Sequence, residues 1–330
     1  MTKDLVSIIL PCYNAEQYIE KFLNSLMIQD YKNFELIVID DGSTDNSYNI
    51  IHDYISQVDF NIVYVYQENL GLPSAINKGL QYVRGEFFTW SDPDDYLHSH
   101  SISSKVNFLK NDKNCEYGFV RTKVTFVDES GEYISESYDC GVSNIFEKII
   151  FEDGVPLTPG NYLLRMECFK SVVPSLTILD NVRGQNWQLL LPMAYKFKCG
   201  FIDESYNYYL VRSGSMSHSD KCLEDEMYRC NEHQTIIIKT ISNFIKESKL
   251  KELVNAIERK YMLKKMYVAI KYNNKEIVND LFKQMDKKSL KVYIHYFLFV
   301  TGSLGYLKSM KSFKKTTHDL LIAVLLYKIR

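Results

Sequence analysis

Residues 85–95 read GEFFTWSDPDD, an apolar run that ends in a cluster of carboxylates. The run up to Trp90 is typical of a buried β-strand, and Asp92, Asp94 and Asp95 follow it closely. Carboxylates this close repel one another unless a positive charge lies among them. At a strand end, that charge is usually a hard divalent cation that oxygen ligands share with substrate phosphates. The stretch therefore predicts a metal-assisted site for a phosphorylated donor.

Strand and helix signals alternate over the residues before this stretch. Short apolar, β-branched runs predict strands, and apolar residues at helical spacing predict helices. Such alternation indicates an α/β fold with a Rossmann-like, mostly parallel sheet and right-handed crossovers. The expected strands are residues 6–10, 34–39, 61–66 and 86–90, and the expected helices are residues 16–28 and 72–83.

Polar clusters follow three of these strands, at residues 11–14, 40–45 and 92–95. Ligands of parallel α/β sheets bind outside the carboxyl ends of the strands. The shared position therefore predicts one site built from the three clusters. Further along the chain, residues 117–127 predict one long strand or a bent pair, and residues 160–166 a strand or a strand with a turn. Residues 186–197 predict a helix, and residues 200–211 a pair of strands.

Charge divides the 330-residue chain into two parts. Residues 1–218 carry 17 Lys/Arg against 29 Asp/Glu, a net charge of −12, and residues 219–330 carry 22 against 12, a net charge of +10. A basic part favours an anionic partner, and a solvated helical face is the alternative. The basic part contains no nucleic-acid recognition motif, so we expect no nucleic-acid partner.

The seven cysteines are odd in number and form no CxxC pair. This usage predicts reduced thiols in a cytosolic protein. The first residues run straight into a strand, so we expect no signal peptide. No apolar run reaches the roughly 18 residues needed to span a bilayer. We therefore expect a cytoplasmic protein, with a peripheral position on the inner face of the cell membrane as an option.

Four motifs, in this order along the chain, resemble the donor-half motifs of family 2 inverting glycosyltransferases, which have the A-type fold. They are residues 6–14 (VSIILPCYN), 38–45 (VIDDGSTD), 68–79 (ENLGLPSAINKG) and 92–95 (DPDD). The resemblance is close over residues 5–97 and looser over residues 98–218. It implies a glycosyltransferase domain over residues 1–218, with a donor-nucleotide half (1–97) and an acceptor half (98–218), followed by a helical region (219–330).

The resemblance also implies roles for the donor-half residues. Asp94 is expected to bind Mn²⁺ or Mg²⁺, and Asp92 to contact the ribose directly or through water. Asp41 is expected to accept a hydrogen bond from a base N–H, which favours a uracil, thymine or guanine nucleotide. The residues expected to frame the base and the ribose are Pro11, Tyr13 and Asn14.

Residues 69–79 depart from the family pattern at one position. Asn69, Gly71 and Asn77 match the loop expected near the ribose and the diphosphate, but Ile76 stands where the family usually has an arginine. Lys78, Arg84 or the helix amides near Leu72 are the candidates to replace that arginine.

A closing segment at residues 208–218 also resembles the family. There Arg212 is a candidate clamp for the diphosphate, since arginine binds phosphate with two parallel hydrogen bonds. His218 is a candidate metal ligand. The alternative is an exposed loop in which neither residue has such a role.

The general base is the second departure. Inverting transfer needs a group that takes the proton of the acceptor hydroxyl. Asn186 stands where the resemblance implies an aspartate, and an amide accepts no proton. Three possibilities stay open: Asp180 is the base, Asn186 only orients an acceptor whose proton leaves through water or a donor phosphate, or the chain binds nucleotide sugar without transferring it.

The resemblance implies a non-processive transferase that moves one sugar from a nucleotide-diphospho-sugar, with UDP as the expected nucleotide, to a hydroxyl of a glycan. A lipid-linked glycan of surface-polysaccharide or capsule synthesis is the expected acceptor. Residues 305–330 combine lysines with a short apolar helix pattern, which suits peripheral contact with an anionic membrane. A helix that packs on its own domain or in a homodimer is the alternative.

Overall fold

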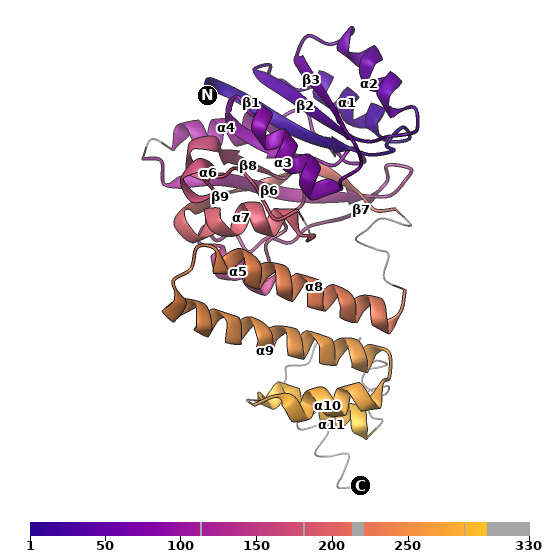
Figure 1. Cartoon of the computed structure of the whole chain (residues 1–330), viewed down its shortest axis with the longest axis vertical. Helices are drawn as coiled ribbons and strands as arrows, with labels where there is room; N and C mark the ends of the chain where they lie inside the picture. The colour runs from indigo at the N-terminus through magenta and orange to yellow at the C-terminus, as the bar shows by residue number, and fades with distance from the viewer. Residues whose placement is uncertain (113, 181, 213–220, 287, 302–330) are drawn as a thin grey trace. The chain divides into compact units, whose positions relative to one another are not determined.

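The structure is a computed structural model that describes residues 1–112, 114–180, 182–212, 221–286 and 288–301 (Figure 1). The chain forms two compact units. The first comprises Met1–Ser219 and Thr235–Lys251, and the second comprises Asp220–Gln234 and Glu252–Arg330. The predictions for His218 and for residues 305–330 lie outside the described residues.

A single mixed sheet forms the centre of the first unit (Figure 1). Its strand order is β3-β2-β1-β4-β8-β6-β9-β5, with β7 paired to β6. The four strands predicted in the first 97 residues are all present, and β1, β2, β3 and β4 run parallel to one another. These strands are β1 (Thr2–Cys12), β2 (Phe34–Asp41), β3 (Asn61–Gln67) and β4 (Gly85–Trp90).

Burial explains why these strands are so apolar. All eight residues of β2 are buried, as expected for a parallel strand covered on both faces. The two predicted helices, residues 16–28 and 72–83, are present as α1 (Ile19–Met27) and α3 (Leu72–Tyr82). A further helix, α2 (Ser47–Ile55), lies between β2 and β3. The predicted α/β fold is therefore confirmed.

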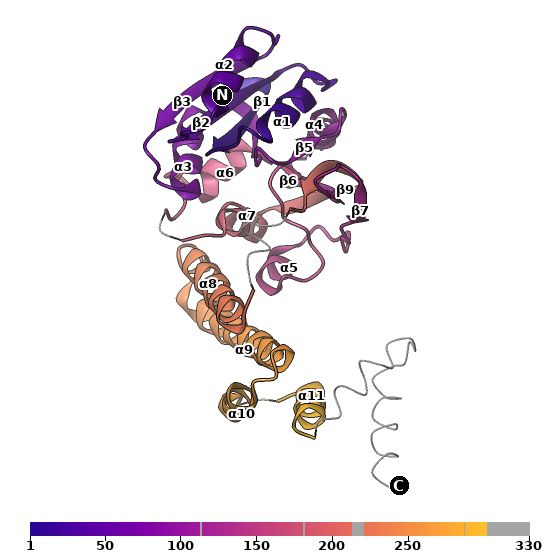
Figure 2. The ribbon, with the colours of Figure 1, turned by 90° about the vertical axis from the view of Figure 1, so that its right-hand side faces the viewer.

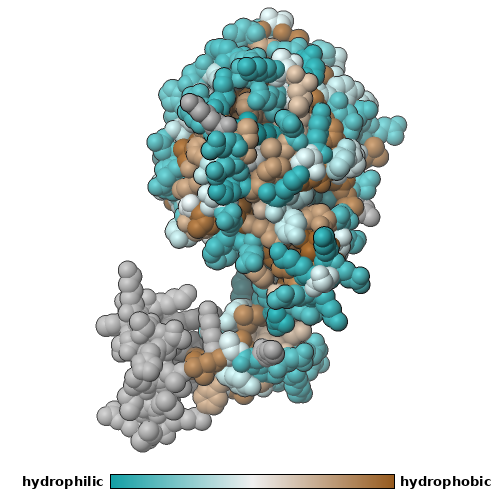
Figure 3. All heavy atoms as spheres, turned by 90° about the vertical axis from the view of Figure 1, so that its left-hand side faces the viewer, coloured by the Kyte–Doolittle hydropathy of each residue, from teal (hydrophilic) through white to brown (hydrophobic). Residues whose placement is uncertain are grey.

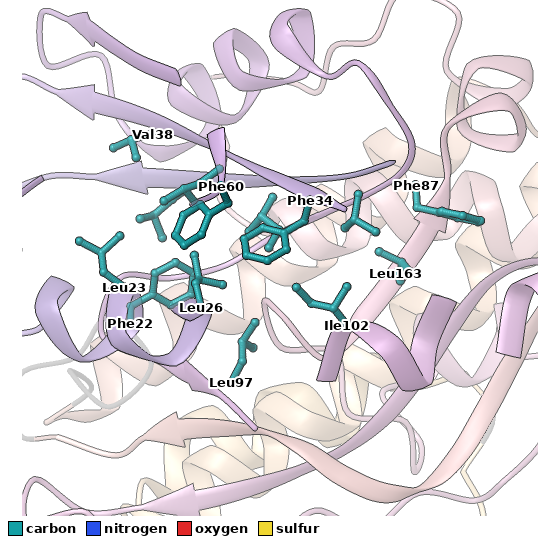
Figure 4. Close-up of a cluster of buried hydrophobic side chains, with 14 of the residues drawn as sticks. Phe22, Leu23, Leu26, Phe34, Val38, Phe60, Phe87, Leu97, Ile102 and Leu163 are labelled. Carbon is teal, nitrogen blue, oxygen red and sulfur yellow. The ribbon is translucent and has the colours of Figure 1, made fainter. Parts of the chain in front are cut away.

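One buried cluster of hydrophobic side chains joins the sheet to the helices on one face (Figure 4). Phe22 and Leu26 of α1 meet Phe34 and Val38 of β2 and Phe87 of β4 in this cluster. Such packing fixes the strands, and therefore the loops at their carboxyl ends.

The second half of the sheet combines both strand directions. β8 pairs antiparallel to β4 and β6, whereas β6 and β9 run parallel. The predicted strand pair at residues 200–211 is wrong, because Lys198–Leu210 forms one continuous strand. It stays continuous because β6 and β5 both pair with it. These elements are β5 (Tyr96–Leu97), β6 (Tyr117–Val127), β7 (Tyr133–Glu136), β8 (Tyr162–Arg165) and β9 (Lys198–Leu210), with α4 (Ser101–Asn111), α5 (Phe146–Phe151), α6 (Met166–Val172) and α7 (Gln185–Lys196).

A fully buried ion pair anchors the segment between β7 and α5. Arg121 of β6 donates to both carboxylate oxygens of Asp139, at 2.7 and 2.6 Å, and neither side chain is exposed. Arg121 also donates to the carbonyl of Val142 at 3.1 Å.

Replacing Asp139 with alanine is expected to lower the free energy of unfolding by about 3–5 kcal/mol, because the Arg121 guanidinium would stay buried without its partner. Urea denaturation followed by circular dichroism measures the change. Asp153→Ala is the matched control, since Asp153 pairs with Lys148 at the surface. Asp153→Ala should lower the free energy of unfolding by less than about 1 kcal/mol. An equal decrease for both variants would contradict the stabilising role of the buried ion pair.

The described part of the second unit is helical (Figure 2). It contains α8 up to Gln234, α9 from Glu252, and all of α10 and α11. The full bounds of these helices are α8 (Leu223–Ser242), α9 (Glu247–Lys271), α10 (Lys275–Gln284) and α11 (Leu290–Val300). Met266, Val278 and Val292 belong to its buried core. The side chains of Asn274 and Ser289 cap α10 and α11 by accepting from backbone N–H groups.

The exposed surface is mixed in character. On the face that Figure 3 shows, polar and charged side chains cover most of the molecule, with apolar ones scattered between them. α11 exposes Leu290, Tyr293, Phe297 and Val300 at helical spacing. Among the described residues, no helix combines the length and the apolar character that crossing a bilayer requires.

Candidate active site

The predicted acidic turn lies between β4 and β5, at the carboxyl edge of the sheet. Asp94 accepts a hydrogen bond from Nε of Arg212 at 3.0 Å. Asp95 is 1% exposed, and its Oδ1 accepts from the backbone N–H of Leu210 at 3.1 Å. The second oxygen of Asp95 is buried and has no hydrogen-bond partner among the residues that the structure describes. The structure thus brings the acidic turn and Arg212 together, although they lie far apart in the sequence.

Burial and mutual repulsion govern the ionisation of this turn. Burial, and then the charge of Asp94, raise the pKa of Asp92 to about 7, while Arg212 opposes the shift. Burial, and then Asp92 and Asp94, raise the pKa of Asp95 well above its ordinary value. Because these folded-state pKa values exceed the unfolded ones, ionisation lowers the stability of the free protein as pH rises through this range.

The chemistry of the turn fits a hard divalent cation. Asp92 and Asp94 offer carboxylate oxygens, the ligands that Mg²⁺ and Mn²⁺ prefer, and the unpartnered oxygen of Asp95 lies in the same turn. Among the described residues, no three potential ligands already surround one point. Magnesium is typically held by one or two carboxylates plus substrate phosphates, so such a partial ligand set is what this site needs.

Aromatic rings and two cations surround the turn. The Arg212 guanidinium lies 4.8 Å from the ring centre of Tyr18. The ammonium of Lys21 lies 3.9 Å from the ring centre of Tyr96, which stacks on Tyr208 at 4.6 Å. Burial lowers the pKa of Lys21. Sequence reasoning missed Tyr18 and Lys21. The only indication in the sequence was their position at the start of the helix that follows β1, with Tyr18 just before its first turn and Lys21 within it.

Asp41 organises the loop that precedes α3. Its Oδ1 accepts from Nε2 of Gln67 at 2.7 Å and from the N–H of Leu70 at 2.9 Å, and its Oδ2 accepts from the N–H of Gly71 at 2.9 Å. The carboxylate therefore fixes the loop that carries Asn69 and Gly71. Oδ2 keeps one acceptor position, so contact with a base N–H stays a prediction.

Gly42 allows this loop to approach β2. Its φ of +78° lies in the left-handed region, and a Cβ at this position would lie 2.9 Å from the backbone nitrogen of Asn69. The loop and the end of β2 are therefore in close backbone contact.

The end of β1 joins the same edge. Asn14 adopts a φ of +48°, and its Oδ1 accepts from the N–H of Thr44 at 2.8 Å. Its own N–H donates to Oγ of Ser43 at 3.1 Å. Pro11 is buried within β1, whereas the Tyr13 side chain is 52% exposed. Tyr13 and Asn14 thus lie at the edge where a nucleoside was predicted.

Two amide side chains hold the backbone just before Asp180. Asn77 of α3 donates to the carbonyl of Ile178 at 2.9 Å and accepts from its N–H at 2.8 Å. Gln188 of α7 accepts from the N–H of Leu179 at 2.7 Å. The exposed Asp180 therefore follows two anchored residues. Asn77, predicted as a donor-binding residue, uses both ends of its amide on this contact.

Asn186 is the centre of a buried hydrogen-bond network. Its Oδ1 accepts from the hydroxyl of Tyr162 and from Nε1 of Trp90, the latter at 3.1 Å. Its Nδ2 donates to the carbonyl of Leu157 at 2.9 Å. These partners assign the orientation of the amide. Trp90 directly precedes the acidic turn, so the network links the first turn of α7 to that turn. Sequence reasoning missed Tyr162 and Gln188.

A protein-family model described as "Glycosyl transferase family 2" matches residues 7–153. Among curated relatives, an uncharacterised glycosyltransferase of Rickettsia typhi is 34% identical over 155 residues, covering 44% of this chain and 48% of the relative. The minor teichoic acid biosynthesis protein GgaB of Bacillus subtilis is 29% identical over 220 residues, covering 64% of this chain and 23% of GgaB. The chain therefore matches half or less of the length of these relatives.

Two solved structures share the fold. S. aureus TarS 1–349 in complex with UDP-GlcNAc gives a TM-score of 0.58 at 21% identity, covering 84% of this chain and 83% of TarS 1–349. The mannosyltransferase PcManGT of Pyrobaculum calidifontis, in complex with GDP-Man and Mn²⁺, gives a TM-score of 0.58 at 16% identity. The match covers 92% of this chain and 80% of PcManGT.

Proposed function

Because residues 7–153 form a family 2 glycosyltransferase domain, we propose that this protein is a non-processive inverting glycosyltransferase that uses a UDP-sugar. The observation that carries the proposal is the acidic turn at the carboxyl edge of the sheet. There Asp94 accepts a hydrogen bond from Arg212, and its neighbours Asp92 and Asp95 have raised pKa values. The UDP-GlcNAc complex of TarS supports the choice of nucleotide.

The donor is proposed to bind along this edge. Tyr13, Asn14 and Asp41 would frame the nucleoside, and Arg212 would contact the diphosphate through its guanidinium. Asp92 and Asp94 would hold Mn²⁺ or Mg²⁺ together with the diphosphate, and the Mn²⁺ complex of PcManGT supports this choice. When bound, the cation offsets the charge that grows on the leaving group. The remaining residues proposed for the donor are Pro11, Asn69 and Gly71.

Asp180 is proposed as the general base. In the proposed reaction, the acceptor oxygen bonds to the anomeric carbon, and the bond from that carbon to the phosphate oxygen breaks. The hydroxyl proton goes to the Asp180 carboxylate, and UDP leaves with the bonding electrons. The hydrogen bonds at Ile178 and Leu179 support this role, because they anchor the backbone just before Asp180.

A glycan of surface-polysaccharide synthesis is the proposed acceptor. The similarity to GgaB, a minor teichoic acid biosynthesis protein, supports it. A lipid-linked acceptor would lie at a membrane, and the exposed apolar stripe of α11 with the basic residues 305–330 supports a peripheral contact there. A homodimer through the same region is the alternative.

A nucleotide-sugar-binding protein without transferase activity is the second candidate. The observation in its favour is Asn186, whose carbonyl oxygen is held by two donors where the family has its base. Release of UDP from UDP-sugars in the presence of glycan acceptors distinguishes the two candidates, because a binding protein releases none.

UDP together with MnCl₂ is expected to raise the Tm of the protein by about 5 °C or more, while Mn²⁺ alone has little effect. A ligand at a hundredfold excess over Kd stabilises the native state by about 2.7 kcal/mol, which corresponds to several degrees for a domain of this size. Differential scanning fluorimetry measures the shift. It should be larger at pH 8 than at pH 6, because the raised pKa of Asp92 leaves its carboxyl protonated below about pH 7. An unchanged Tm at both pH values would contradict the proposal.

A further inference from the structure

A cavity of about 250 Å³ lies beside Asn186, within the first unit. It is formed by the first turn of α7 and by the segment that begins in α5. Its volume is about eight times the ~30 Å³ share of one water molecule in the liquid, which is enough for one six-membered sugar ring. The residues that line it are Ile149, Glu152, Val155, Leu157, Gly184, Gln185, Asn186 and Trp187.

Gln185 is the unusual member of this lining. The residue as a whole is 8% exposed, and its carboxamide makes no hydrogen bond within the part of the chain that the structure describes. Its polar atoms are not among the buried atoms that lack a partner, so they are open to the cavity that the residue lines. The two other amides of the same helical turn are hydrogen-bonded within the protein, Asn186 to Trp90, Tyr162 and Leu157, and Gln188 to Leu179. Gln185 is therefore the amide of this turn that is available to a ligand in the cavity.

The backbone next to Gln185 is held in place. Gly184 has a φ of +85°, and a Cβ there would lie 2.7 Å from Cε3 of Trp187 and 3.0 Å from Cδ1 of Ile236. Only glycine fits this close contact. The first turn of α7, and with it Gln185, is therefore pre-positioned rather than free to turn towards another partner.

The residues that line the cavity suit a neutral carbohydrate. A carboxamide both donates and accepts, as a hydroxyl does. The Trp187 ring and the aliphatic Ile149, Val155 and Leu157 offer apolar surface for the C–H face of a sugar, and the Glu152 carboxylate offers a hydrogen-bond acceptor. None of the eight lining residues is lysine or arginine, which argues against a phosphate.

We propose that this cavity binds a neutral pyranose of the acceptor glycan, with Gln185 hydrogen-bonded to its hydroxyls and Trp187 against its ring. The proposal rests on the proposed glycosyltransferase function. It gives the acceptor a place next to the reaction centre, because Asn186 connects the cavity to Trp90 and the acidic turn.

Tryptophan fluorescence tests the proposal, since the chain has two tryptophans and Trp90 is only 3% exposed. The protein is titrated with methyl glucoside, galactoside, mannoside and N-acetylglucosaminide. We expect a saturable change with at least one of them. Trp187→Phe should abolish that change, and Gln185→Ala should weaken the binding at least tenfold.

The isosteric Gln185→Glu should also weaken glycoside binding. Because it keeps the size of the side chain, it shows whether weaker binding by the alanine variant results from misfolding. Gln57→Ala, an exposed glutamine beyond α2, is the matched control and should bind as the wild type does. Binding that is unaffected at Gln185, or no saturable response to any of the four glycosides, would overturn the proposal.

Calorimetry with UDP and Mn²⁺ on the same samples separates this inference from the proposed function. We expect UDP to bind the wild type and Gln185→Ala equally. Glycoside binding without UDP binding would overturn the proposed function and leave the carbohydrate site standing. UDP binding without any glycoside response would overturn only the carbohydrate site.

Discussion

Asp94→Ala is expected to lower kcat/KM for sugar transfer by about a thousandfold or more. Asp94 is the carboxylate that faces Arg212 in the acidic turn, and it is proposed to hold the divalent cation with Asp92. Without it, the charge on the departing UDP loses most of its electrostatic stabilisation, which is typically the largest part of such catalysis. Release of UDP at saturating Mn²⁺ measures the loss.

The matched control is Asp53→Ala, an exposed aspartate on α2. It should leave kcat/KM unchanged. Asp94→Ala should also weaken UDP binding in the presence of Mn²⁺ but not in its absence. Full activity of Asp94→Ala with every tested donor would falsify the metal-assisted mechanism.

Asp180→Asn is expected to lower kcat by about 10²–10⁴-fold, the usual contribution of a general base. The substitution keeps the size of the side chain and removes its ability to take a proton. Because the backbone before Asp180 is held by Asn77 and Gln188, the fold around it should be retained. The KM for the UDP-sugar should stay within about twofold of the wild-type value, since Asp180 is not placed at the donor.

Steady-state kinetics at saturating UDP-sugar checks this prediction. Asp59→Asn, an exposed aspartate beyond α2, is the control. Unchanged kcat in Asp180→Asn would instead show that the acceptor proton leaves by another route, through water or a donor phosphate.

The acidic turn and the sheet could be predicted because local sequence determines them. β-Branched apolar runs bounded by polar clusters specify buried parallel strands. Three aspartates directly after β4 have few roles other than binding a metal ion. Arg212 was predicted from a separate motif, and its contact with Asp94 brings the two motifs to one place.

The roles of the amides could not be predicted, because an amide has no fixed partner until the chain is folded. Asn77 was expected at the donor, but it binds Ile178, 101 residues further along the chain. Asn186 was recognised as a missing base, whereas its contacts with Trp90 and Tyr162 depend on strands that pair far apart in sequence. The buried ion pair of Arg121 escaped notice for the same reason.

The contact between Asn77 and Ile178 has a kinetic consequence. α3 begins at the loop that Asp41 fixes, where the nucleotide is proposed to bind. Asn77 of the same helix binds the backbone of Ile178, two residues before Asp180. In the proposed function, α3 therefore connects the loop at the nucleotide with the backbone before the proposed proton acceptor. This arrangement would favour a compulsory order, in which the nucleotide sugar binds first.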